Sequence, residues 1–265
     1  MQAPVFDPTW AADVIALYRH DMQEIWDRNI APQIWNQYHN QLDLYLGIAG
    51  ERPLHILDVG CAQGTLALML AERGHRVIAV DIRPQFLDYA RSRHTQGDIQ
   101  FLVANVLEDE ISGGHDLIFA NQIIEHLVYP AELLTRLMRL LKPGGRLVTT
   151  TPNAAYVKNP LPSYAEIGDP RDWEHMQFTA DGDGHFFAYR AEELRKLFQA
   201  TGYQQVHTRY FETPFINGHM KLRYLHRFAP VGLLRFLDRL TLSLPGVGGR
   251  SAHQLLATGL RPQET

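Results

Sequence analysis

The stretch Ile56-Leu57-Asp58-Val59-Gly60-Cys61-Ala62-Gln63-Gly64-Thr65-Leu66-Ala67 decides the fold class of this chain. An apolar run that contains an acid is followed by two glycines and then at once by an apolar pattern with helical spacing. Glycine permits positive φ and the close approach of another group, and the N-terminus of a helix offers unpaired N–H groups. The order of residues therefore predicts a strand that turns sharply into a helix and leaves room for a ligand.

Beyond this stretch, short β-rich segments alternate with amphipathic helical patterns, which is typical of a parallel sheet covered on both faces. Residues 9–47 look helical, and Pro143-Gly144-Gly145 is expected to end a helix and turn the chain into a strand. The predicted strands are 55–59, 76–80, 99–103, 116–120, 146–151, 204–210 and 251–260, and the helices are 66–73, 84–93, 131–141 and 191–201. We expect a Rossmann-like, doubly wound α/β sheet of seven mostly parallel strands.

Two segments depart from the alternation inside the predicted main domain, residues 51–265, which a helical cover of residues 1–50 precedes. Residues 152–190 are rich in proline and aromatic side chains, and a loop of this length in a compact domain is usually functional. We expect it to form a loop over the substrate. Residues 217–250 form a basic, amphipathic insertion before the last strand.

The overall composition excludes several classes of protein. The 265 residues carry a net charge of −4, which argues against a general nucleic-acid binder. The single cysteine rules out an internal disulfide framework. The first residues lack the pattern of a secretory signal, and no apolar run has the roughly 20 residues that span a bilayer. A cytoplasmic location is therefore expected.

Two kinds of ligand compete for the glycine turn. A nicotinamide fingerprint needs G-x-G-x-x-G, but its second glycine position is Ala62 here and no later glycine completes the set. Asp81 ends the second strand, where an acid accepts hydrogen bonds from ribose hydroxyls. Because both a nicotinamide and an adenosyl ligand carry such a ribose, the turn and the acid leave the choice open.

Further motifs favour the adenosyl ligand. Leu57–Gly64, Val80-Asp81, Glu125-His126-Leu127 and Leu140-Leu141-Lys142-Pro143-Gly144-Gly145 follow one another in order along the chain. Together they resemble the class I S-adenosylmethionine-dependent methyltransferases, from about residue 54 to 151 and more loosely to 202. Within that family, the chain is most similar to the O-methyltransferases of ubiquinone biosynthesis and to methyltransferases of bacterial surface glycans.

The resemblance implies a set of cofactor-binding residues. The glycine turn would contact the methionine part of S-adenosylmethionine, the acid after the second strand the ribose, and a residue after the third strand the adenine. The residues at these positions are Asp58, Gly60, Cys61, Ala62, Gln63, Gly64, Asp81, Ile82, Asn105, Val106 and Asn121. Alanine stands at 62 where the family has glycine, and Asn105 stands where it has aspartate, although an amide oxygen can still accept from the adenine amino group.

The methyl acceptor is expected to be a small, partly apolar or lipid- or glycan-linked molecule that is methylated on oxygen. Enzymes that methylate amino groups of nucleic acids typically carry Asn/Asp-Pro-Pro-Tyr after the fourth strand, whereas this chain has Ala120-Asn121-Gln122-Ile123. Oxygen methylation needs in-line positioning and a base, and His126 and His185 are the candidates. Both could instead serve packing or loop anchoring. No metal is expected, because related Glu-x-x-Glu-His sites have an acid where this chain has Gln122.

Residues 221–244 of the insertion leave two interpretations open. Their apolar stripe packs on the domain or on a second subunit, or it lies on an anionic membrane and makes the chain membrane-associated. The oligomeric state is left as monomer or homodimer. The alternative functions are a cofactor-binding but inactive partner subunit and, more remotely, a nicotinamide oxidoreductase.

Overall fold

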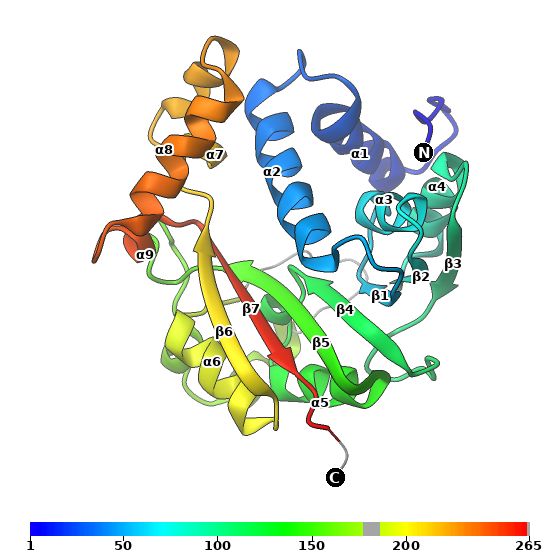
Figure 1. Cartoon of the computed structure of the whole chain (residues 1–265), viewed down its shortest axis with the longest axis vertical. Helices are drawn as coiled ribbons and strands as arrows, with labels where there is room; N and C mark the ends of the chain where they lie inside the picture. Colours follow the sequence, from blue (N-terminus) through cyan, green and yellow to red (C-terminus); the bar gives the residue numbers. More distant parts are fainter. Residues whose placement is uncertain (177–185, 264–265) are drawn as a thin grey trace. The chain divides into compact units, whose positions relative to one another are not determined.

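The computed structural model describes residues 1–176 and 186–263 (Figure 1). It has a seven-stranded sheet in the order β3-β2-β1-β4-β5-β7-β6. The pairs β1–β2, β2–β3 and β4–β5 are parallel, whereas β7 runs antiparallel to β5 and β6. The described chain divides into two compact units, Met1–Ala104 with Pro214–Leu240 and Asn105–Thr213 with Thr241–Thr265. The predicted mostly parallel, seven-stranded α/β sheet is confirmed, whereas the division of the chain at residue 50 stays a prediction.

The first unit contains three parallel strands and the N-terminal helices. Its elements are α1 (Ala12–Asp21), the π-helix η1 (Met22–Trp26), α2 (Pro32–Ala49), β1 (His55–Val59), α3 (Thr65–Glu72), β2 (Arg76–Asp81), α4 (Pro84–Arg93), β3 (Asp98–Val103), α7 (Pro214–Asn217), the 3-10 helix η5 (Leu222–Arg227) and most of α8 (Val231–Ser243). Proline at the first position of α2 and of α4 is preorganised for a helix start. Val14 and Leu17 of α1 pack with Phe86 and Tyr89 of α4 in one buried cluster.

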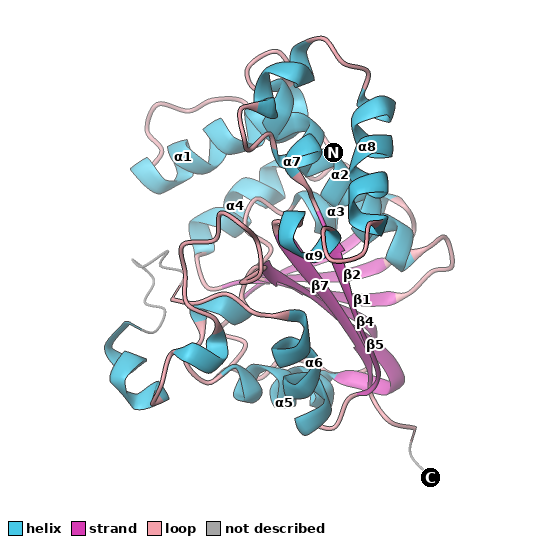
Figure 2. Cartoon of the chain, turned by 90° about the vertical axis from the view of Figure 1, so that its left-hand side faces the viewer, coloured by secondary structure: helices cyan, strands magenta, loops and turns pink. Residues whose placement is uncertain are grey.

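The second unit is built on four strands. Its elements are β4 (His115–Asn121), the 3-10 helix η2 (Ile124–His126), α5 (Pro130–Leu140), β5 (Leu141–Pro152), the 3-10 helices η3 (Tyr164–Glu166) and η4 (Pro170–Met176), α6 (Ala191–Ala200), β6 (Gln204–Phe211), α9 (Gly248–Ser251) and β7 (Gln254–Leu260). Figure 2 shows α5 and α6 together on one side of these strands, where Leu133, Leu137 and Phe198 bury their side chains.

Three local expectations differ from the structure. Pro143-Gly144-Gly145 lies inside β5, because His115 of β4 pairs with Leu141 and Leu117 with Arg146, which leaves the residues between them as a bulge. The last strand begins at Gln254, since Gly248–Ser251 form the short helix α9. The N-terminal helical segment contains a π-helix and a break before Pro32, which period counting alone does not detect.

The turn between β1 and α3 requires glycine at position 64. Gly64 has φ 74°, and a Cβ atom there would lie 2.7 Å from the Cβ of Ala90 in α4. Gly74, after α3, also has positive φ, at 86°, but a Cβ atom there would meet nothing within 4 Å. A comparison of Gly64 with Gly74 therefore distinguishes the cost of backbone strain, which both positions share, from the cost of close packing, which only Gly64 has.

We expect Gly74→Ala to lower the free energy of unfolding by about 1–2 kcal/mol, the cost of a left-handed residue with a side chain. Gly64→Ala should cost roughly 1–3 kcal/mol more, because it also overpacks the contact between α3 and α4. Urea denaturation of the two variants measures the difference. Equal losses would show that the close approach at Gly64 contributes nothing.

Candidate functional site

The glycine turn of the first unit is held open by three left-handed residues. Gly60, Ala62 and Gly64 have φ of 66°, 45° and 74°. The backbone N–H of Cys61 donates to the carbonyl of Val80 at 3.0 Å, and that of Gly64 donates to the carbonyl of Cys61 at 2.7 Å. Alanine at position 62 thus takes the conformation that glycine prefers, at a cost of about 1–2 kcal/mol. Strain of this kind is often retained at ligand sites.

Asp81 is fixed against this turn by backbone amides. Its Oδ2 accepts from the N–H of Ala62 and its Oδ1 from the N–H of Arg83, both at 3.0 Å. The Arg83 Nε lies 3.4 Å from the same Oδ1. A carboxylate has about four acceptor positions, so the two amides and the Arg83 guanidinium leave capacity for a further hydroxyl donor. Ile82, the next residue, is half-buried.

Asp58 lies behind the turn, at the end of β1. Its side chain is buried, and this burial, followed by the charge of Asp81, raises its pKa to about 7. Burial likewise raises the pKa of the Cys61 thiol well above its usual value. Cys61 is therefore a neutral thiol and not a nucleophile at neutral pH.

A polar network behind the turn was missed by the sequence analysis. The Gln63 side-chain nitrogen donates to Glu24 Oε2 at 2.7 Å and to the Tyr38 hydroxyl at 3.1 Å. The fully buried Arg93 donates to the Gln63 carbonyl at 2.6 Å and lies 3.0 Å from Asp21 Oδ1. The sequence signal for this network was the presence of Asp21 and Glu24 within an apolar helical pattern. Acidic residues are rarely buried without a partner, so their place in such a pattern indicates buried partners.

In the second unit, Asn105 caps a turn after β3. Its side-chain oxygen accepts from the N–H of Leu107 at 3.1 Å, and its own N–H donates to Asp109 Oδ2 at 2.8 Å. One lone pair of the amide oxygen that was expected to face adenine is therefore used locally. Val106, the next residue, is buried.

The carboxyl end of β4 carries the remaining candidates of the second unit. Asn121 Oδ1 accepts from the Thr150 hydroxyl at 3.1 Å, and Gln122 has φ 54°. His126 is half-buried at the end of η2. Its backbone N–H donates to the carbonyl of Ile123 at 2.9 Å. His185 lies outside the described residues.

Comparison with known proteins assigns this arrangement to a family. The sequence model of the methyltransferase-domain family matches residues 18–208. The chain belongs to this methyltransferase family. A ubiquinone biosynthesis O-methyltransferase of Xanthomonas oryzae pv. oryzae (strain PXO99A) is 35% identical over 112 residues, which are 41% of this methyltransferase and 46% of the relative. A tRNA 5-carboxymethoxyuridine methyltransferase of Escherichia coli (strain K12) is 32% identical over 142 residues, 48% of this chain and 53% of the relative.

The methyltransferase thus spans about half the length of the curated relatives that it matches. Among solved structures, it is similar to the N-methyltransferase NodS from Bradyrhizobium japonicum WM9 in complex with S-adenosyl-L-homocysteine. The TM-score is 0.53 at 17% identity, over 94% of this chain and 98% of that one. That likeness shows the fold. The comparisons confirm the predicted family and the Rossmann-like fold, and with them S-adenosylmethionine as the cofactor.

Glu125 of the methyltransferase differs from a metal-binding acid. It is fully buried, and burial raises its pKa to about 8. When the Gln122 amide is turned with its nitrogen toward Glu125, that nitrogen donates to Oε1 at 3.2 Å and the amide oxygen accepts from the backbone N–H of Thr151 at 3.3 Å. A protonated, buried carboxyl is a poor ligand. Within residues 1–176 and 186–263, no group of three His, Cys, Asp or Glu side chains is placed to hold a metal ion.

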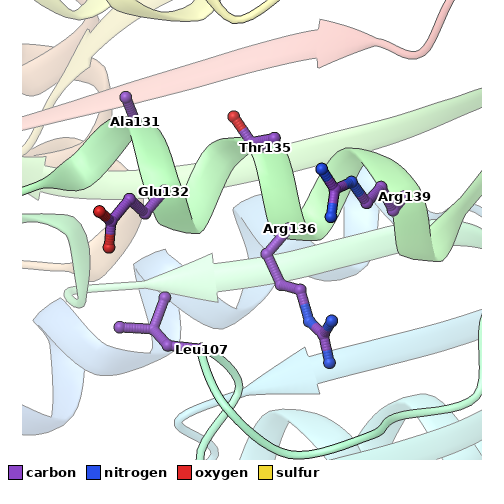
Figure 3. Close-up of a pocket in the computed structure, with 6 residues that line it drawn as sticks. All are labelled: Leu107, Ala131, Glu132, Thr135, Arg136 and Arg139. Carbon is purple, nitrogen blue, oxygen red and sulfur yellow. The ribbon is translucent and has the colours of Figure 1, made fainter.

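A pocket of about 370 Å³ lies beside α5 of the second unit and contains none of the predicted site residues. In Figure 3, Glu132 and Arg136 extend from α5 toward the segment that carries Leu107. Arg136 donates from Nη2 to the carbonyl of Asp109 at 2.5 Å. The pocket is lined by the exposed, charged side of α5 and by Leu107.

The network behind the glycine turn makes stability depend on pH. Burial, followed by the charge of Asp21, raises the pKa of Glu24 from 4.5 to about 8. The folded chain therefore keeps a proton that the unfolded chain loses, so this contribution to stability is complete below about pH 4.5 and is lost as pH rises through about 8. Glu24→Gln keeps an acceptor for Gln63 and removes the titration.

We expect the wild-type chain to lose stability between about pH 6 and pH 9, and Glu24→Gln to reduce that loss by roughly 1–3 kcal/mol. Urea denaturation at both pH values measures the difference. Glu132→Gln, at an exposed acid on α5, serves as the control and should leave the loss unchanged. An unaltered loss in Glu24→Gln would show that this carboxyl does not titrate in the folded chain.

Proposed function

We propose that the chain transfers a methyl group from S-adenosylmethionine to an oxygen of a small, partly apolar acceptor. The observation that carries the proposal is the anchoring of Asp81 by the amides of Ala62 and Arg83. This contact places a carboxylate with spare acceptor capacity directly against the glycine turn. Ribose hydroxyls donate to such a carboxylate, and the turn accommodates the methionine part.

In the first unit, the proposed cofactor residues are Asp58, the turn Gly60–Gly64, Asp81 and Ile82. Asn105, Val106 and Asn121 of the second unit are proposed from the family resemblance alone. Asn105 suits the adenine amino group through the second lone pair of its side-chain oxygen. Gly60, which has no side chain, leaves the backbone of the turn accessible to the methionine part of the cofactor.

The chain's own contribution to the reaction is positioning and removal of a proton. S-adenosylmethionine, when bound, supplies the methyl group as a strongly electrophilic sulfonium. His126 stands at the carboxyl end of β4, where ligands bind in this fold, and its imidazole accepts the hydroxyl proton of the acceptor. His185 stays a second candidate base.

An oxygen acceptor is favoured over an amino group by the absence of Asn/Asp-Pro-Pro-Tyr after β4 and by the ubiquinone O-methyltransferase relatives. The net charge of −4 disfavours a nucleic-acid acceptor, although one relative acts on tRNA by its name. The alternative is a cofactor-binding but inactive partner subunit, and turnover by the isolated chain would exclude it.

The cofactor assignment predicts a loss of affinity in Asp81→Ala. A charged acceptor of ribose hydroxyls contributes roughly 1.5–3 kcal/mol, so S-adenosylhomocysteine should bind about ten- to a hundredfold more weakly. Isothermal titration calorimetry gives the affinity, and circular dichroism checks that the fold is kept. Asp98→Ala, at an exposed acid of β3, is the control. Unchanged affinity in Asp81→Ala would remove Asp81 from the site.

The base assignment predicts that His126→Ala lowers turnover by about 10²–10⁴ while the affinity for S-adenosylhomocysteine hardly changes. Methyl transfer from labelled cofactor is followed with the best acceptor from a panel of phenols and alcohols. His207→Ala, at an exposed position of β6, is the matched control. Turnover near normal in His126→Ala would show that this residue is not the base. Loss of turnover with EDTA that Mg²⁺ restores would contradict the expectation that no metal is needed.

A further inference from the structure

The segment from α7 to α8 presents apolar side chains to solvent. Phe228 is 86% exposed and Phe236 is 55% exposed, and Leu233 and Leu240 are also largely exposed. On α8, positions 233, 236 and 240 fall on one face, because three- and four-residue steps return to the same side of a helix. The predicted amphipathic stripe is thus present, but it does not pack on its own domain.

A different face of α8 makes the contact with the first unit. Leu234 and Asp238, one turn apart, are buried. Arg235 forms an ion pair with Asp43 of α2, with Nη2 2.7 Å from Oδ2. Figure 1 shows α8 beside α2, and this ion pair joins the two helices. Because the helix is attached through its other side, the apolar stripe is free to meet another surface.

The rest of the segment is also held in place. The side-chain nitrogen of Asn36 in α2 lies 2.9 Å from Nδ1 of the buried His226 in η5. Gln33 of α2 donates to the carbonyl of Asn217 at 2.7 Å. These contacts fix η5 and α7 on α2. The exposed apolar residues are therefore preorganised on a folded scaffold and lose little entropy on binding.

The charges around the stripe have one sign. Asp238 is the only acid between residues 214 and 240, and it is buried. The exposed cations of the segment are Lys221, Arg223, Arg227 and Arg239. Arg239 borders the stripe on α8 by helical position. The surface thus combines exposed leucine and phenylalanine with uncompensated positive charge, on a chain whose net charge is −4.

We propose that residues 220–240 form a docking surface for an anionic lipid membrane, with α8 lying in the plane of the headgroups. Apolar side chains enter the boundary of the acyl chains while arginine and lysine meet the acidic headgroups. The exposed leucine side chains favour lipid over RNA. RNA binding relies on bases that stack on aromatic rings and on phosphates that pair with cations, so leucine would contribute little to it. No helix among the described residues is long and apolar enough to cross a bilayer.

The contribution of the basic side chains to membrane binding is tested by sedimentation of the full chain with vesicles of equal parts phosphatidylglycerol and phosphatidylcholine. Each basic residue near such a surface contributes about fivefold in partitioning (about 1 kcal/mol). Arg227→Glu with Arg239→Glu should therefore weaken binding by at least about 25-fold. Arg235 is left intact because it holds α8 to α2. Arg171→Glu with Lys196→Glu changes the net charge equally at exposed positions outside the surface and should leave binding unchanged.

The contribution of the exposed apolar side chains is tested with Phe228→Ser and Phe236→Ser. Each substitution should weaken binding to the same vesicles about tenfold or more. Val157→Ser, at another exposed apolar residue, is the matched control. Binding should fade as salt rises to about 0.15 M and be absent with phosphatidylcholine alone. Equal binding by the wild type and the charge-reversed variant, preference for tRNA over vesicles, or a dimer that Phe236→Ser dissociates would each overturn the proposal.

Discussion

The first unit depends on the buried guanidinium of Arg93. It meets Asp21 of α1, the carbonyl of Gln63 in the glycine turn and the hydroxyl of Thr65 at the start of α3. A buried cation is costly unless it is paired, and removal of one partner typically costs 3–5 kcal/mol. One side chain of α4 thereby fixes the N-terminal helices and the turn to the same scaffold. The position of the turn, and not only its conformation, is a consequence of this ion pair.

Signals confined to neighbouring residues were sufficient for most of the fold. The strand β1 and the helix α4 have the bounds that their patterns predict, because an apolar run before Gly60 and a proline at the start of α4 are local features. The turn and Asp81 were also predictable, since both lie at strand ends whose order the alternation determines. The motif Pro143-Gly144-Gly145 was placed correctly along the chain but became a bulge, because its pairing with β4 is a property of the sheet.

The remaining features depend on contacts between distant residues. The protonated state of Glu24 and of Glu125 follows from burial, which no local pattern encodes. The same holds for α8, where sequence spacing identified a stripe but could not tell that Leu234 and Asp238 take the inner side. For Asn105, the position in the sequence suggested a contact with the ligand, but its side-chain oxygen also accepts a hydrogen bond that closes a local turn. Site chemistry is thus less predictable than topology, since it depends on which groups exclude water from one another.

The place of β7 between β5 and β6 has a consequence for synthesis of the chain. Among the described residues, β6 pairs with β7 alone, and β7 follows both β5 and β6 along the chain. Until that strand emerges, both β5 and β6 present unpaired backbone groups, which are the usual templates for intermolecular pairing. The second unit therefore completes the pairing of β5 and β6 only after β7 has left the ribosome. A truncation within β7 would leave both β5 and β6 open on the sides that β7 now covers, so it should lead to aggregation more readily than the number of lost residues suggests.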